Sequence, residues 1–229
     1  MKKFKWILCI LTVIITLGMF FVLPNTVPVH FDINGNVDRW GGKAELLMMP
    51  IILIVCALGF EPLKKSYIRK AETCEDEKEK AGHLSNANVL NITGIITLIL
   101  FFVINIITLY AAYITVYPEK NLPQIDIIKI AGILMGITFI ALGNYMPKTR
   151  NNRNIGFRLP WTRYNDATWN KSNRFASYVM MIAGGISIIT SIWGGNLASY
   201  LSIGSILIAL PIIMIYAYII YQTEKKKEK

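Results

Sequence analysis

Cysteine and charged residues are both scarce in this chain of 229 residues. Its three cysteines, Cys9, Cys56 and Cys74, form no CxxC pair, so the sequence contains neither a disulfide framework nor a cysteine-based zinc or redox motif. Charged residues make up 17% of the chain against 54% hydrophobic ones. That balance excludes an ordinary soluble domain, and the 11% of aromatic residues excludes a disordered chain.

Sequence motifs for enzyme chemistry are missing as well. The chain has no GxSxG, HExxH or P-loop motif and no pair of carboxylates within an apolar run. It also lacks the inverted repeat of broken helices that marks many secondary transporters. We therefore expect a non-enzymatic protein with no cofactor and no resident metal ion.

Long hydrophobic runs are what the sequence has instead. About 20 apolar residues in a helix cross the roughly 30 Å of a bilayer's hydrocarbon core. Six runs approach this length, and the second is short enough to form a re-entrant or tilted segment. They lie at residues 6–23, 46–60, 89–117, 127–146, 175–193 and 197–221. The sequence predicts an all-α integral protein of the lipid bilayer, a bundle of six transmembrane helices in the cell membrane.

The distribution of basic residues predicts how this bundle is oriented. All of the 24 lysines and arginines except Arg39, Lys43, Lys120 and Lys129 lie before the first run, between the second and third, between the fourth and fifth, or after the sixth. Because basic residues beside a span stay in the cytoplasm, both termini should be cytoplasmic. The net charge of +10 is then explained by topology, so we expect no direct nucleic-acid binding.

The first loop, residues 24–43, faces outward in this topology and is expected to be extended. The turn-forming pairs Asn34-Gly35 and Gly41-Gly42 divide it. We expect a short strand over residues 27–31, a turn, and a second extended piece.

Charged side chains in this outer loop allow two interpretations. His30, Asp32 and Asp38 can converge on a cation or on a peptide amine, since an imidazole and two carboxylates are acceptable ligands. Alternatively, the loop is a compact interface element in which Asp38 and Arg39 cap turns and Trp40 lies at the level of the lipid headgroups. The second interpretation leaves room for partner binding.

The loop between the second and third runs, residues 61–88, carries basic and acidic residues in equal number. Its mixed charge is typical of a solvated helix or a flexible linker. A cytoplasmic docking surface is the alternative.

The loop at residues 147–174 interleaves seven basic residues with four aromatic ones. This mixture suits the headgroup zone, where aromatic rings lie at the interface and guanidinium groups meet anionic lipid phosphates. Asn165 or Asp166 can cap the N-terminus of a helix that continues into the fifth run. Pro160 should end any helix before it and leave residues 156–162 as an ordered turn.

Polar and small residues inside the runs are interpreted as packing features. Lys129 lies near the outer end of the fourth run and can extend toward the water and pair with Asp126. Asn and Thr side chains, Asn105 among them, can hydrogen-bond between helices for about 0.6–2 kcal/mol each. Two small-xxx-small pairs predict close helix contacts, Gly132 with Gly136 and Ser187 with Ser191.

Two stretches of the sequence resemble known families of bacterial membrane proteins. The first is similar to the N-terminal domain of unknown function that often precedes an SdpI domain. Its residues are Leu23, Pro24, Pro28, His30, Phe31, Gly35, Asp38, Arg39, Trp40, Gly41 and Lys43. The second resembles the signature of the SdpI immunity-protein family and comprises Ile155, Gly156, Phe157, Arg158, Leu159, Pro160, Trp161, Thr162, Trp169 and Arg174.

This resemblance implies a two-span N-terminal domain (residues 1–65), a charged cytoplasmic linker (66–88) and a four-span SdpI-like domain (89–229). It further implies a multi-pass protein of Gram-positive-type bacteria that protects its producer from a secreted killing peptide. A second implied role is that the toxin-bound protein holds a small helix-turn-helix repressor at the membrane. A transporter or efflux component, and a membrane sensor without an immunity role, are the alternatives.

Candidate binding residues follow from the two motifs. In the outer loop, the candidates to receive a peptide or another ligand are Pro28, His30, Phe31, Asp32, Gly35, Asp38, Arg39, Trp40 and Lys43. In the inner loop, the candidates to face a partner are Gly156, Arg158, Pro160, Trp161, Thr162, Trp169 and Arg174. The chain departs from the family pattern at two places, since Asn173 stands where a histidine is common and Ser177 where a glycine is common.

Overall fold

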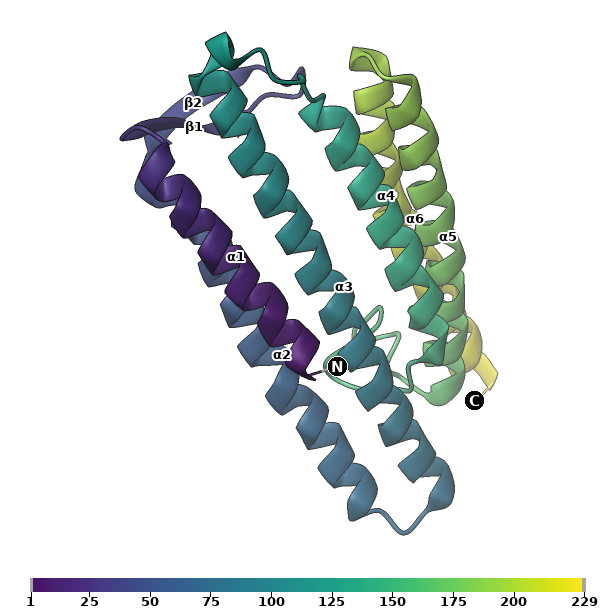
Figure 1. The fold of residues 1–229 in the computed structure, drawn as a ribbon. Helices are drawn as coiled ribbons and strands as arrows, with labels where there is room; N and C mark the ends of the chain where they lie inside the picture. The colour runs from purple at the N-terminus through teal and green to yellow at the C-terminus, as the bar shows by residue number, and fades with distance from the viewer. Residues whose placement is uncertain (1, 228–229) are drawn as a thin grey trace.

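The computed structural model describes residues 2–227, which form six long helices and one β-hairpin (Figure 1). The helices are α1 (Lys2–Val22), α2 (Met48–Glu72), α3 (Glu77–Val116), α4 (Ile127–Tyr145), α5 (Asp166–Trp193) and α6 (Asn196–Lys227). The strands are β1 (Thr26–Phe31) and β2 (Val37–Gly42), and the short 3-10 helices are η1 (Lys43–Leu47), η2 (Pro118–Lys120) and η3 (Met146–Lys148). Each long helix is apolar enough to cross a membrane, which confirms the predicted multi-pass helical architecture.

Helices α2 and α3 are longer than the apolar runs that predicted them. Residues 48–60 form the first half of the continuous 25-residue α2 rather than a re-entrant turn. The 40 residues of α3 extend for about 60 Å at 1.5 Å per residue, twice the hydrocarbon thickness. Residues 61–88 are therefore mostly helical, which agrees with the solvated helix rather than the flexible linker among the predictions for this loop. The chain reverses at residues 73–76, where the Asp76 carboxylate caps α3 by accepting a hydrogen bond from the Glu79 amide (2.7 Å).

The helices associate as two groups of three. Helix α2 packs extensively along α3, and α5 packs extensively between α4 and α6. The contacts of α1 with α2 and α3 are smaller and similar in extent to the contact between α3 and α4, which joins the two groups. The beginning of α1, the end of α6, the α2–α3 turn and the loop between η3 and α5 lie at one end of the bundle (Figure 1). The hairpin and the α3–α4 connection lie at the other. The two sequence motifs are thus at opposite ends of the molecule.

Helices α4 and α5 cross at small residues. A Cβ atom on Gly136 would lie 2.5 Å from the carbonyl oxygen of Gly184, and one on Gly184 would lie 2.6 Å from that of Gly136. The Ser187 hydroxyl donates to the Gly132 carbonyl oxygen (2.9 Å) and lies 2.6 Å from the Ser202 hydroxyl of α6. These contacts confirm the close packing predicted from the spacing of small residues.

Polar side chains also join elements inside the bundle. The buried Asn105 amide of α3 donates to the buried Thr16 hydroxyl of α1 (3.1 Å), which confirms the predicted interhelical role of Asn105. At the start of α4, the Asp126 carboxylate accepts a hydrogen bond from the backbone amide of Lys129 (2.9 Å). Asp126 therefore contacts its predicted partner Lys129 through the backbone amide of Lys129, as the N-cap of α4.

Candidate functional site

The hairpin between α1 and η1 is closed by an aspartate-capped turn. Strands β1 and β2 pair antiparallel. The Asp32 carboxylate accepts hydrogen bonds from the backbone amides of Asn34 (2.9 Å) and Asn36 (2.8 Å), and Gly35 has a φ of +82°, which favours glycine. The predicted sequence of strand, turn and second extended piece is confirmed.

Two of the three predicted ligand side chains of the hairpin meet across the strands. The Nδ1 atom of His30 lies 2.6 Å from Oδ1 of Asp38, and both side chains are exposed. Asp32 is occupied by its own turn, and Arg39 pairs with Glu45 of η1 at 2.9 Å. The turn-capping role predicted for Asp38 is thus filled by Asp32. Among the described residues, no group of three or more His, Cys, Asp or Glu side chains is placed to hold a metal ion.

Other motif residues of the hairpin differ in exposure. Pro28 is buried and lies opposite Trp40 in the sheet, whereas Trp40 is 51% exposed. Phe31 is half-buried at the end of β1. The Lys43 ammonium lies 4.6 Å from the centroid of the Phe20 ring of α1, a cation–π geometry. Trp40 is therefore the aromatic ring that the hairpin offers to a lipid interface or a partner.

The turn of the hairpin should depend on pH in the acidic range. Hydrogen bonds from the Asn36 and Asn34 amides hold the pKa of the Asp32 carboxyl below its usual value of about 3.9. Because the folded pKa is lowered, the stabilisation is fully present above the usual value and is lost as the pH falls through the lowered one. We expect carboxyl ¹³C NMR of the chain in lipid nanodiscs to show Asp32 titrating below an ordinary aspartate. Titration at or above the ordinary value would contradict the capped turn.

Trp169 fixes the loop that joins η3 to α5, called the motif loop below (residues 149–165). Its side chain, on the first turn of α5, is fully buried. The indole Nε1 donates to the carbonyl oxygen of Thr149 (3.0 Å). A buried indole N–H requires such an acceptor. This contact ties the beginning of the motif loop to the helix that follows it.

Gly156 lies against Trp169 where the loop passes closest to α5. Its φ is +94°, and a Cβ atom there would lie 2.7 Å from Oδ1 of Asn173 and 3.0 Å from the Trp169 ring. The buried Asn173 side chain accepts a hydrogen bond from the Phe157 amide (2.7 Å) and donates one to the Trp169 carbonyl oxygen (3.1 Å). Both the backbone conformation and the available space therefore require glycine at this position.

Two threonines close the second half of the motif loop. The buried Thr162 hydroxyl accepts from the Leu159 amide (2.8 Å) and donates to the Phe157 carbonyl oxygen (3.0 Å). Asn165 and Thr168 form a reciprocal capping box, each side chain accepting from the other's backbone amide (2.9 and 3.0 Å). Of the two predicted N-cap residues, Asn165 takes this role and Asp166 is the first residue of the helix, and the ordered turn before it is confirmed.

Asparagines connect the motif loop to the first group of helices. Oδ1 of the buried Asn152 accepts from the Tyr67 hydroxyl of α2 (3.0 Å) and from the Ile155 amide (2.9 Å). On α3, Oδ1 of Asn86 accepts from the Arg150 amide (2.8 Å). These contacts of Asn152, Tyr67 and Asn86 were not predicted from the sequence. The run of asparagines at 151–154 was the available signal, because asparagine side chains commonly bond to nearby backbone in tight loops.

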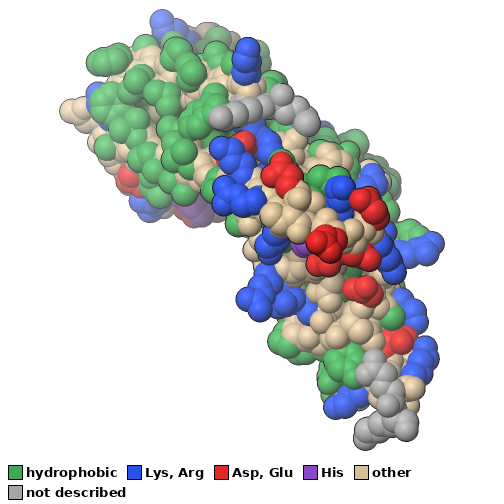
Figure 2. Space-filling model, turned by 90° about the horizontal axis from the view of Figure 1, so that it is seen from below, with side chains coloured by type: hydrophobic (Ala, Val, Ile, Leu, Met, Phe, Trp, Pro, Cys, Tyr) green, Lys and Arg blue, Asp and Glu red, His purple; other side chains and the backbone are tan. Residues whose placement is uncertain are grey.

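Basic side chains around the motif loop are exposed while its uncharged anchors are buried. The exposed residues are Lys148, Arg150, Arg153, Arg158, Arg163, Lys171 and Arg174. Figure 2 shows basic side chains spread over this end of the molecule, with acidic ones beside them. The Arg158 guanidinium donates to the Arg153 carbonyl oxygen (2.6 Å) and that of Arg174 donates to the Tyr178 hydroxyl (3.2 Å). The exposed guanidiniums are the part of the loop that a partner can reach.

Pro160 and Trp161 form the tip of the motif loop beside α6. Pro160 is exposed, whereas Trp161 is half-buried and meets the Tyr218 ring edge-on, with 5.9 Å between ring centroids. An edge-to-face pair of this kind contributes about 0.5–1.5 kcal/mol beyond the burial of area. Trp161 therefore holds the tip against the last helix.

Family models match both ends of the chain. Residues 7–54, which span most of α1, the hairpin and the start of α2, match a domain of unknown function, DUF1648. Residues 148–222, which contain the motif loop, α5 and most of α6, match the SdpI/YfhL protein family. The resemblance to the SdpI family is confirmed. Both predicted motif stretches lie within these matches.

A curated relative extends the similarity over the whole bundle. Immunity protein SdpI of Bacillus subtilis (strain 168) is 26% identical over 216 residues, which cover 94% of this chain and 93% of the relative. An uncharacterized protein of Archaeoglobus fulgidus is 46% identical over 46 residues, 17% of this chain and 25% of that protein. No solved structure matches the chain. The SdpI-like similarity thus includes the helices α3 and α4, which lie between the two family matches.

Proposed function

We propose that this chain is a non-enzymatic membrane immunity protein that protects its cell from a secreted antimicrobial peptide. The observation that carries the proposal is the similarity to Immunity protein SdpI, which extends over 94% of the chain rather than over one motif. The family matches over both loop motifs and the helical membrane architecture support this proposal.

The proposal includes an orientation. Basic residues surround the end of the bundle that holds the beginning of α1, the end of α6 and the motif loop, so this end lies in the cytoplasm under the positive-inside rule. The hairpin then lies on the outer surface, where a secreted peptide arrives. Fusing a reporter that is active only in the cytoplasm to the C-terminus tests this assignment.

The primary experiment is a survival assay. A sensitive bacterium expressing the full chain is challenged with a panel of synthetic membrane-active peptides matching those secreted by related strains. We expect protection against at least one peptide, compared with cells that carry the empty vector. Export of a peptide or dye without protection would favour a transporter. No protection by a chain inserted in the membrane would leave a sensor role as the better account.

The tip of the motif loop should contribute to protection. We expect Trp161→Ala and Arg158→Ala each to lower survival about tenfold, the effect of about 1.4 kcal/mol of lost partner affinity, with unchanged protein in the membrane. The reason is that Trp161 holds the tip against Tyr218 and Arg158 presents an exposed guanidinium. Arg153→Ala, which removes another exposed charge of the same loop, is the matched control. Unchanged survival of both variants would remove the tip from the mechanism.

A second candidate function, retention of a cytoplasmic repressor at the membrane, is favoured by the exposed basic residues of the motif loop. Guanidiniums in this number suit an acidic face of a small helix-turn-helix protein. The test follows a fluorescent fusion of a helix-turn-helix protein encoded beside this gene. Peptide-dependent movement of the fusion to the membrane supports retention, and a uniformly cytoplasmic fusion in protected cells argues against it.

A further inference from the structure

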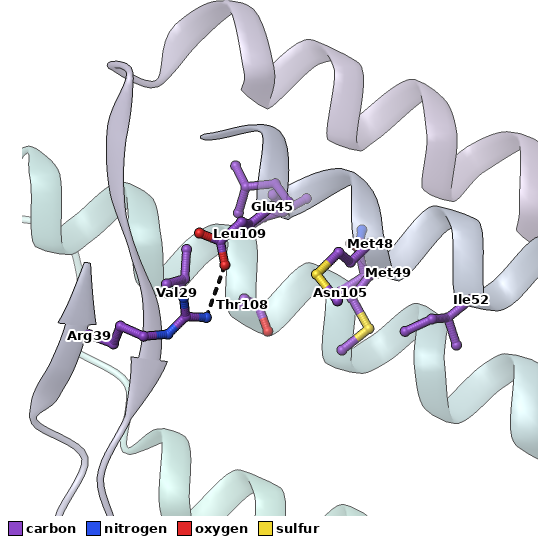
Figure 3. A pocket seen from close by; sticks show the side chains of 10 residues that line it. Val29, Arg39, Glu45, Met48, Met49, Ile52, Asn105, Thr108 and Leu109 are labelled. Atoms are coloured by element: carbon purple, nitrogen blue, oxygen red, sulfur yellow. Dashed lines mark hydrogen bonds and ion pairs between the residues drawn. The ribbon is translucent and has the colours of Figure 1, made fainter. Parts of the chain in front are cut away.

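A cavity of about 220 Å³ lies under the hairpin, between the ends of α2 and α3 (Figure 3). Its wall on α2 consists of Met48, Met49 and Ile52, and Thr108 lies on the α3 side. Met48 is 57% exposed and Ile52 is 37% exposed, so the cavity opens to the exterior of the bundle. Ligands of drug size occupy pockets of about 300–1,000 Å³, and an engineered cavity of about 150 Å³ holds benzene. The size therefore suits a single large side chain.

An ion pair borders this cavity on the hairpin side. Arg39 of β2 reaches Glu45 of η1, with 2.9 Å between the guanidinium nitrogen and the carboxylate oxygen (Figure 3). Their side chains are 57% and 34% exposed, so each keeps hydrogen-bonding capacity toward the outside. A surface pair of this exposure contributes little to stability. It does place one positive and one negative group at the opening of an otherwise largely apolar space.

The methionines make the cavity adaptable. Methionine is unbranched and polarizable, fits irregular apolar partners, and makes favourable contacts between its sulfur and aromatic ring edges. Such residues recur on surfaces that bind apolar peptide side chains. The wall of Met48 and Met49 therefore favours an aromatic side chain over a fixed small molecule.

We propose that this cavity receives one aromatic side chain of a secreted, membrane-associated peptide, while the Arg39–Glu45 pair meets the charged or backbone groups beside that residue. The inference rests on the proposed function, since it names the site at which the peptide is recognised. Peptide is favoured over a lipid acyl chain because a guanidinium and a carboxylate side by side match peptide amide, amine and carboxylate groups. A hydrocarbon chain has no polar group for either side chain, and a phospholipid whose headgroup contacts the pair is distinguished by the crosslinking experiment below.

Photo-crosslinking tests the occupant directly. A diazirine-bearing amino acid replaces Met48 in the full chain, and living cells are irradiated with each synthetic peptide of the survival panel and with its variant in which aromatic residues are alanine. We expect a crosslink to a peptide, identified by mass spectrometry, and at least about a tenfold lower yield with the alanine version. Crosslinks to phospholipid alone would overturn the proposal.

Two further variants separate filling of the cavity from damage to the fold. Thr108→Phe, which places a ring in the cavity, should abolish the peptide crosslink, whereas Val55→Phe on the exposed face of α2 should retain it. The double exchange R39E with E45R keeps an ion pair but reverses its polarity, and should also weaken the crosslink. A full crosslink in Thr108→Phe, with the peptide still bound, would overturn the proposal.

The survival assay in the same cells distinguishes the two proposals. Protection that persists in Thr108→Phe at normal membrane abundance leaves the immunity function standing and removes the cavity from it. If the peptide crosslink is lost in Thr108→Phe but cells with the parent chain gain no protection, the cavity is supported as a peptide site and the immunity function is contradicted. If no peptide of the panel gives either protection or a crosslink, both proposals are contradicted.

Discussion

Replacing Trp169 with alanine is expected to destabilise the protein by about 3–5 kcal/mol, the usual range for deleting a buried tryptophan. The side chain is fully buried, and its loss removes the contact with Gly156 and leaves the Thr149 carbonyl oxygen without its indole donor. Thermal unfolding of the chain in nanodiscs measures the loss. Limited trypsin digestion should then cut at Arg158 and Arg163, because the loop that carries them is no longer held.

Trp169→Phe is the matched control for this prediction. Phenylalanine retains most of the packing and removes the N–H donor, so we expect a smaller loss of about 1–3 kcal/mol, the cost of an unsatisfied buried acceptor. If Trp169→Ala unfolds at the temperature of the parent chain, the motif loop does not depend on this anchor and the account given for it is wrong.

Gly156→Ala should have the second-largest effect. A left-handed backbone costs a residue with a Cβ atom about 1–2 kcal/mol, and here the added atom also meets Asn173 and the Trp169 ring at 2.7 and 3.0 Å. The Phe157 amide lies next to this position and bonds to Asn173, so the displacement breaks that bond too. We expect a loss of stability of more than about 2 kcal/mol and a loss of protection in the survival assay.

Gly185→Ala supplies the control for glycine replacement itself. This residue is on α5, and nothing lies within 4 Å of the Cβ position that alanine would add. Alanine there should leave stability unchanged or raise it by about 0.5–1 kcal/mol, because glycine weakens a helix interior. Equal effects of the two replacements would show that Gly156 has no special conformational role.

Much of this fold could be predicted because the signals that determine it are local. The apolar runs mark the spans, the Asn34-Gly35 pair marks the hairpin turn, and Asn165 marks the start of α5. The full lengths of α2 and α3 could not be predicted from hydropathy. The charged residues at 61–88 suit a solvated helix and a flexible linker equally. Only the packing of α2 against α3 decides between these two structures.

The candidate sites were predicted less completely than the fold. The motif identifies Gly156, Thr162 and Trp169 as important, yet Thr162 and Trp169 are buried, Gly156 is half-buried against Trp169, and all three shape the loop rather than face a partner. Contacts such as that of Tyr67 with Asn152 join positions 85 residues apart, and no local pattern indicates them. The cavity under the hairpin combines residues of both strands, η1, α2 and α3 and is likewise visible only in three dimensions.

The amide of Asn173 has a consequence for how the motif loop responds to acid. A histidine at this position would also fit in its neutral form, because a neutral imidazole has one donor and one acceptor, as many as Asn173 uses toward Trp169 and Phe157. Histidine, however, gains a proton between about pH 5 and 8 and then has no acceptor left for the Phe157 amide. An asparagine amide does not titrate. In this chain the loop is closed by bonds that a fall in pH leaves intact.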